Sequence, residues 1–124
     1  MGLNDTSIGC RTLQSRLERE LPAEVLRKKD LQIGDLVLIR TKNSVYSIYV
    51  LENEQYLVSG GWFDRKGVSP RSVEINGCTW GGTAIKQDIV AGRGLFLEFG
   101  NQVVTTRIED FRIVRAHSLS QIPN

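Results

Sequence analysis

The sequence IGDLVLIRTKNSVYSIYVLENEQYLVS, residues 33–59, decides the fold of this chain. It contains runs rich in β-branched and aromatic residues, which favour strands because their side chains pack well on a pleated surface. The predicted strands cover residues 36–41, 45–51 and 55–59. The polar turns that join them are Lys42-Asn43-Ser44 and Glu52-Asn53-Glu54. Turns this short connect antiparallel neighbours, so the stretch predicts a three-stranded meander.

Further strands are predicted toward the C-terminus. Leu95, Leu97 and Phe99 alternate along the chain, so they share one face of a strand. Gly100-Asn101 predicts a two-residue hairpin turn, because Gly and Asn tolerate positive φ there. The remaining predicted elements are a returning strand over 102–108, a turn at Glu109-Asp110 and a last strand over 111–115.

An excursion, residues 60–94, separates these two β segments. Residues 60–71 (GGWFDRKGVSPR) are rich in glycine and lack periodicity, which predicts a long loop of the kind that often carries function. Asn76-Gly77 lies between two β-prone triplets, residues 73–75 and 78–80, and predicts an inserted hairpin. Residues 83–91 fit either a short strand or an irregular connection.

The N-terminal region has helical periodicity instead. Leu13, Leu17 and Leu21 recur every four residues and predict a helix over residues 10–21 with one apolar stripe. Proline lacks a backbone N–H and interrupts a helix, so Pro22 ends it. A second, short helical turn is predicted from Pro22 to Lys29.

The chain is expected to fold as one domain. Its 124 residues suit a single core over residues 10–116, with flexible ends at 1–9 and 117–124. Hydrophobic residues make up 40% and charged residues 24%, a balance that excludes a disordered protein. Sixteen Lys and Arg against fourteen Asp and Glu give a net charge of +2, which neither demands nor excludes a nucleic-acid partner.

The sequence predicts a cytoplasmic location. No apolar run approaches the ~18 residues of a membrane span. Residues 1–11 contain no apolar stretch that would serve as a signal peptide. Cys10 and Cys78 lie far apart without a metal-binding spacing, so reduced thiols are expected rather than a disulfide.

Catalytic patterns are missing from the sequence. The single histidine, His117, lies in the polar tail, so nothing predicts a catalytic triad, and His and Cys are too scarce for a zinc site. The carboxylates of Glu52 and Glu54, and those of Glu109 and Asp110, belong to predicted turns, where they ordinarily serve solubility. The chain is therefore expected not to be an enzyme and to need no cofactor or metal.

Aromatic and basic residues gather in the loop over residues 60–71. Trp62, Arg65 and Lys66 suit a single-stranded nucleic acid, because bases stack on rings while cations attract phosphates. Two alternatives stay open for Trp62 and Phe63. They either cap an open end of a barrel or insert into a neighbouring subunit.

Two other basic positions have similar alternatives. Arg93 lies between two glycines and either contacts phosphate or belongs to a simple bend before Leu95. The run Arg27-Lys28-Lys29 either contacts phosphate or complements the C-terminus of the predicted second helical turn.

The order of helix, meander, excursion and tight hairpin resembles the Sm/Lsm-like RNA-binding proteins, which are five-stranded SH3-like barrels that close into rings. The segment from Gly34 to Ser59 is similar to the first motif of that family. The segment LFLEFGNQVVTTRI, residues 95–108, is similar to its second motif. Together these segments cover about a third of the chain, and the excursion is longer than in a minimal member.

The resemblance implies a ring-forming homo-oligomer that binds single-stranded RNA. Tyr56 matches a position where a stacking aromatic residue is often found, and Gly100 and Asn101 match the turn of the second motif. Val58 stands where the family has a base-contacting asparagine, and Phe99 where it has Arg or Lys. The expected nucleic-acid-binding residues are Tyr56, Trp62, Arg65, Lys66, Arg93, Gly100 and Asn101.

The expected fold is therefore mainly β, a small five-stranded SH3-like or Sm-like barrel with an N-terminal α-helix and an inserted hairpin. The β-prone edge over residues 103–106 has to be covered by that helix or paired with another subunit. The expected function is non-enzymatic RNA binding. The alternative is a structural or adaptor protein that binds other proteins through the barrel, without nucleic acid.

Overall fold

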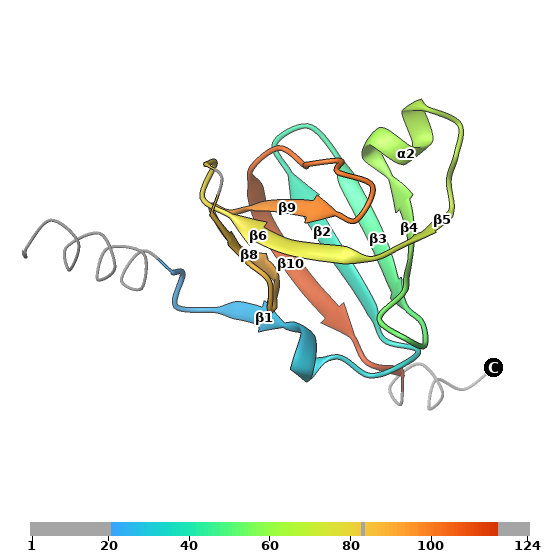
Figure 1. The fold of residues 1–124 in the computed structure, drawn as a ribbon, viewed down its shortest axis with the longest axis horizontal. Helices are drawn as coiled ribbons and strands as arrows, with labels where there is room; N and C mark the ends of the chain where they lie inside the picture. Colours follow the sequence, from blue (N-terminus) through green and yellow to red (C-terminus); the bar gives the residue numbers. More distant parts are fainter. Residues whose placement is uncertain (1–20, 83, 117–124) are drawn as a thin grey trace, which may run out of the picture.

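The computed structural model describes residues 21–82 and 84–116 (Figure 1). The helix predicted over residues 10–21 lies outside the described residues except for its last residue, Leu21. Cys10 and the tail from His117 onward lie outside them as well.

The chain is mainly β, and its largest element is an antiparallel sheet with the strand order β10-β2-β3-β4-β5. Its strands are β2 (Leu36–Thr41), β3 (Val45–Val50), β4 (Tyr56–Gly60), β5 (Arg71–Val73) and β10 (Ile108–Val114). The predicted meander is confirmed, because β2, β3 and β4 pair in sequence through short turns. β10 pairs with β2 and places the C-terminal strand beside the first strand of the meander.

Two smaller antiparallel sheets complete the β structure. One has the order β7-β6-β9, and the other pairs β1 with β8. The strands are β1 (Val25–Arg27), β6 (Ile75–Thr79), β7 (Ile85–Lys86), β8 (Ile89–Gly92) and β9 (Phe96–Phe99). Figure 1 shows β6 and β9 crossing in front of the five-stranded sheet. In the described part of the chain, none of the three sheets closes into a barrel by itself.

The core lies between the five-stranded sheet and the smaller sheets. Alternate residues of β2, β3 and β4 point into it, which gives the period of two expected of a half-buried sheet. Leu95, Leu97 and Phe99 are all buried, so the predicted inward face of that strand is confirmed. The four residues of β8 are buried throughout, because this strand pairs with β1 and packs against β6, β9 and β10.

The predicted hairpin turn at Asn76-Gly77 is wrong, because β6 runs straight through both residues. The register of β6 against β9 shifts between Ile75 and Gly77, which marks a β-bulge. Gly77 has φ of 136°, and a Cβ there would lie 2.3 Å from the carbonyl oxygen of Lys86 on β7. The glycine therefore permits close strand approach instead of a chain reversal.

The predicted helical turn from Pro22 to Lys29 is also wrong. Residues 25–27 form β1 and pair with β8, where Val25 lies opposite Gly92 and Leu26 opposite Ala91. A 3₁₀ helix follows over Lys28–Asp30. Burial of Leu26 and the hydrogen bonds to β8 outweigh the local helical preference.

The predicted strand over 102–108 and the turn at Glu109-Asp110 need correction as well. Only Val104 bridges to Glu98, while the rest of 100–107 is a loop. β10 begins at Ile108 and contains a register shift before Asp110, so the two carboxylates lie on a bulged strand. The loop over 60–71 contains a short helix, α2 (Gly61–Arg65).

Candidate functional site

Four basic side chains lie at one end of the molecule, where the β2–β3 turn, α2 and the 100–107 loop meet. We call this cluster of Lys42, Arg65, Lys66 and Arg107 the basic end; all four residues are exposed. The backbone N–H of Lys42 donates to the carbonyl of Arg107 at 3.0 Å, which joins the turn to the loop. The Arg65 guanidinium donates to the Ser44 Oγ at 3.2 Å and joins α2 to the same turn.

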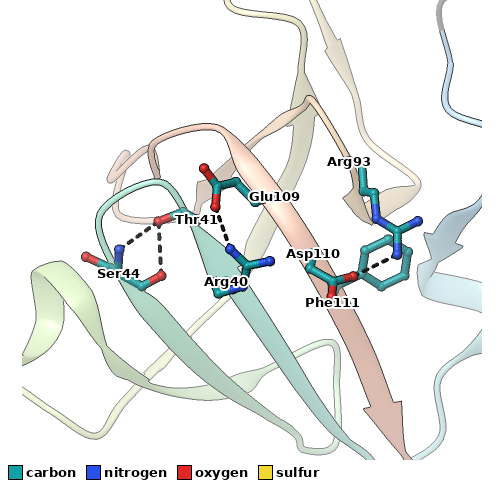
Figure 2. Close-up of polar contacts among 7 residues, drawn as sticks. All are labelled: Arg40, Thr41, Ser44, Arg93, Glu109, Asp110 and Phe111. Atoms are coloured by element: carbon teal, nitrogen blue, oxygen red, sulfur yellow. Dashed lines mark hydrogen bonds and ion pairs between the residues drawn. The ribbon is translucent and has the colours of Figure 1, made fainter.

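The β2–β3 turn is held rigid by Thr41 and Ser44. The Thr41 hydroxyl donates to the Ser44 carbonyl at 3.2 Å and accepts from the Ser44 N–H at 3.1 Å (Figure 2). The Thr41 N–H also donates to the Ser44 carbonyl at 2.8 Å. These bonds satisfy the turn's backbone locally, and Lys42 lies in the exposed part of the turn.

The position of α2 depends on Gly60 and Asp64. Gly60 has φ of 99°, and the Asp64 carboxylate accepts its N–H at 3.0 Å. The Trp62 N–H donates to the Tyr46 hydroxyl at 3.3 Å, which ties the first turn of the helix to β3. The positive φ of Gly60 reverses the direction of the chain, and α2 therefore lies over the end of the sheet.

An aromatic cluster anchors α2 in the core. Phe63 is fully buried, and its ring packs edge-on against Phe99 with centroids 5.1 Å apart. Trp62 packs edge-on against Phe63 at 5.2 Å and keeps part of its surface exposed. Tyr46 closes the cluster at 5.8 Å from Phe99. Phe63 therefore belongs to the core, and Trp62 packs at the border of the core.

The cations of the basic end form no ion pairs with the described residues. Within residues 21–82 and 84–116, none of its four cations has a carboxylate oxygen within 4.0 Å. Arg40 nearby is paired with Glu109 (Figure 2). The Arg107 guanidinium lies 5.5 Å from the centroid of the Phe96 ring, a cation–π contact that leaves its charge available.

Five of the seven residues predicted from the sequence lie at or beside the basic end. Trp62 and Arg65 are on α2, and Lys66 follows it. Gly100 and Asn101 directly follow Phe99, whose ring packs on α2, so they begin the loop that ends at Arg107. The Asn101 side chain accepts from the Val103 N–H at 3.3 Å and shapes this loop.

The structure does not bring Tyr56 to this site. Tyr56 starts β4, while α2 follows the other end of that strand, and the Tyr56 side chain is buried in the core. Burial, together with the charge of Glu54, raises the pKa of its hydroxyl. A buried ring offers no free face for stacking, so Tyr56 does not share an exposed surface with Trp62.

Arg93 is separated from the basic end by its own ion pairs. Its guanidinium donates to the Asp110 carboxylate at 2.8 Å (Figure 2). It lies 3.5 Å from the carboxylate of Glu24. It also lies 5.9 Å from the centroid of the Phe111 ring. These contacts indicate that Arg93 links β1, β8 and β10 to one another.

Sequence reasoning missed Lys42 and Arg107. The sequence pattern predicts a turn at Lys42 and a strand at Arg107, and it gives neither residue a role in binding. Their meeting depends on the pairing of β2 with β10, which are far apart in the chain. No local sequence pattern predicts a contact between residues so far apart.

Other kinds of site receive no support from the described residues. No group of three or more His, Cys, Asp or Glu side chains gathers there as a metal site would require. Cys78 is buried, and burial raises the pKa of its thiol to about 12, which makes it unreactive. Within the described residues, no helix has the length and apolar character needed to cross a membrane.

Comparison of the chain with protein-family models, with curated proteins and with solved structures found no match.

Proposed function

We propose that this chain is a non-enzymatic, Sm-like module that binds single-stranded RNA at the basic end. The observation that carries the proposal is that four exposed cations lie on three adjoining segments at one end of the molecule, one of which is α2 with the partly buried Trp62. Among the described residues, none of these cations has a carboxylate oxygen within 4.0 Å. Cations attract the phosphates of a strand, and an exposed aromatic face holds one base by stacking. Both contacts tolerate any base sequence.

The Sm-like part of the proposal is supported by the way the sheets are connected. Only Glu74 separates β5 from β6, so a nearly continuous strand passes from the five-stranded sheet to the three-stranded sheet. β10 then pairs with β2 at the opposite edge. A small SH3-like barrel has such a bent strand at its corner.

In this proposal each element has a separate task. Lys42, Arg65 and Arg107 contact successive phosphates along the end of the molecule. The Trp62 ring stacks on a base, and the exposed turn at Gly100-Asn101 borders the same path. The buried Phe63 holds α2 so that these groups keep their spacing without RNA.

A salt titration with a fluorescent single-stranded RNA tests the proposal. Each phosphate contact contributes about −0.7 to the slope of log affinity against log salt for a single strand. Lys42→Ala and Arg107→Ala are each expected to reduce that slope by about one such contact. Lys86→Ala, which removes an exposed cation on β7, is the matched control and is expected to leave the slope unchanged.

Failure to bind RNA at low salt would contradict the proposed function. Equal effects of Lys42→Ala and Lys86→Ala would show that net charge is responsible and that the basic end is not the site.

A further inference from the structure

A cleft opens at the end of the molecule opposite to the basic end. One wall comes from residues 28–33, which connect β1 to β2, and the other comes from residues 50–54, the turn between β3 and β4. Tyr56, the first residue of β4, completes the lining. Figure 1 shows both walls on the side of the sheet away from α2. The cleft has a volume of about 360 Å³, which is sufficient for a small organic molecule.

The two walls are fixed by backbone hydrogen bonds. The Gly34 N–H donates to the Val50 carbonyl at 2.9 Å and joins one wall to the other. The Leu51 N–H donates to the Gln55 carbonyl at 2.9 Å and closes the β3–β4 turn. A cleft whose walls are already ordered loses little conformational freedom when a ligand binds.

Much of the lining is apolar. Leu31 and Leu51 are half-buried in the two walls, and Val50 is buried between them and the core. Ile33 lies at the border of the cleft and is 62% exposed, more than any other large hydrophobic residue that the structure describes. Single exposed apolar residues are ordinary, but one that borders an apolar cleft adds to a surface for an apolar ligand.

The charged side chains of the lining are mainly positive. Lys28 and Lys29 lie in one wall, and Glu54 in the other is the single carboxylate of the lining. Within residues 21–82 and 84–116, neither lysine has a carboxylate oxygen within 4.0 Å. The lining therefore favours a ligand that carries negative charge.

Tyr56 adds a hydrogen-bond donor that is fixed in the core. Its side chain is 4% exposed, and its hydroxyl has no hydrogen-bond partner among the described residues. Buried tyrosine hydroxyls ordinarily have one, as the Tyr46 hydroxyl does with the Trp62 N–H. Burial and the charge of Glu54, which also lines the cleft, raise the pKa of the Tyr56 hydroxyl. The hydroxyl therefore lies toward the cleft and keeps its proton for donation.

We propose that this cleft binds a small organic acid, a molecule with one anionic group and a compact apolar body. The anionic group accepts a hydrogen bond from the Tyr56 hydroxyl and lies near the ammonium groups of Lys28 and Lys29. The apolar body packs on the leucines of the two walls. This inference goes beyond RNA binding and is independent of it, because the basic end shares no residue with the cleft.

Three probes of one shape test the proposal by NMR of the ¹⁵N-labelled full-length protein. They are 2-naphthoate, the neutral 2-naphthylmethanol and the cationic 2-naphthylmethylammonium. The anion is expected to shift the backbone signals of Leu31, Asn53 and Tyr56 until they saturate. The alcohol is expected to bind more weakly at the same signals, and the cation to leave them unchanged.

Four substitutions assign the contacts. Tyr56→Phe keeps the buried ring and is expected to weaken 2-naphthoate binding about tenfold, because a hydrogen bond to a charged group is lost. Lys29→Gln is expected to weaken it about threefold, as for an exposed charge pair. Glu54→Gln removes a like charge and is expected to strengthen it. Lys86→Gln, which removes an exposed cation outside the lining, is the matched control and is expected to change nothing.

Several results would overturn the proposal. One is the absence of shifts at millimolar 2-naphthoate, which would show that the cleft is closed to small molecules or already filled by the chain itself. Others are shifts spread over the whole surface, equal affinity for the three probes, and unchanged affinity in Tyr56→Phe. The RNA titration is a separate measurement on other residues, so either proposal can fail while the other holds.

Discussion

Asp35 joins the beginning of β2 to the end of β10. Its carboxylate is buried and accepts hydrogen bonds from the N–H groups of Gln32 and Ala116 and from the Arg115 guanidinium, each at 2.9 Å. Burial raises the pKa of Asp35, but these three donors outweigh it and hold the pKa below its ordinary value of 3.8. The charged carboxylate therefore stabilises the fold.

Replacing this carboxylate is expected to change the pH dependence of stability. A depressed pKa contributes stability that is present above the unfolded-state value and is lost as the pH falls through the folded value. Asp35→Asn is expected to lower the free energy of unfolding by about 2 kcal/mol at pH 7, because hydrogen bonds to a charged group are lost.

Urea unfolding of both proteins between pH 7 and pH 2 measures this effect. The difference between them should shrink as the pH drops below 3.8. A constant difference would contradict the role given to the Asp35 charge.

The path of the chain from β4 into α2 depends on Gly60. Its φ is 99°, and a Cβ there would lie 2.1 Å from the carbonyl oxygen of Val45. Gly60→Ala is expected to cost about 3 kcal/mol of unfolding free energy through strain and steric overlap. Gly82→Ala is the control, since no atom lies within 4 Å of its added Cβ. Similar melting temperatures for the two variants would show that the backbone of Gly60 relaxes freely.

At the scale of elements, α2 is a five-residue helix stabilised by its contacts rather than by its length. Phe63 inserts fully into the core, and its neighbour Trp62 stays partly outside. One residue therefore holds the helix, and the other is free to meet a ligand.

Two substitutions on α2 are expected to separate these roles. Phe63→Ala should cost roughly 4 kcal/mol of unfolding free energy, because it opens a cavity among aromatic rings. Trp62→Ala should keep the fold while weakening RNA binding by about 1–3 kcal/mol through lost stacking. Thermal denaturation and the RNA titration measure the two effects. Unchanged RNA binding by the Trp62→Ala variant would contradict the stacking role proposed for Trp62.

The distance along the chain between paired strands explains which elements could be predicted from the sequence. The meander is local, since each of its strands pairs with the next through a short turn, and it was predicted correctly. The Asn76-Gly77 hairpin was wrong because the dipeptide lies inside β6, which pairs with the distant β9. Pairing between distant strands overrode the strongest local turn signal in the chain.

The candidate site was predicted in part for the same reason. Trp62, Arg65 and Lys66 are neighbours in sequence, so their clustering was visible as a composition pattern. Tyr56 is predicted from its match to a stacking position in the resemblance to Sm/Lsm-like proteins, but the period of β4 turns its side chain inward. Arg107 reaches the site through a loop whose path depends on β10, and the sequence gives no signal for that path.

For the whole molecule, the Sm-like proposal predicts a ring. The 100–107 loop leaves Val104 49% exposed, with a single bridge to Glu98. An exposed, β-prone loop beside a strand offers backbone groups that pair readily with a second chain. The mass in solution is therefore expected to be a multiple of 13.9 kDa.

Sedimentation equilibrium at micromolar concentration measures this mass. Val104→Pro, which removes a backbone donor, is expected to shift the protein toward the monomer. A wild-type monomer would contradict ring assembly while leaving the RNA titration to decide the function of the basic end.

The pairing of β2 with β10 also has a consequence for biosynthesis. β2 leaves the ribosome early, but its partner across the sheet, residues 108–114, is made some seventy residues later. Until then one edge of the nascent meander has no partner strand, and the Asp35 carboxylate lacks its donors at Arg115 and Ala116. The sheet is completed only when this late strand emerges. A premature stop before Ile108 would therefore release a chain with an unpaired strand edge, which promotes aggregation.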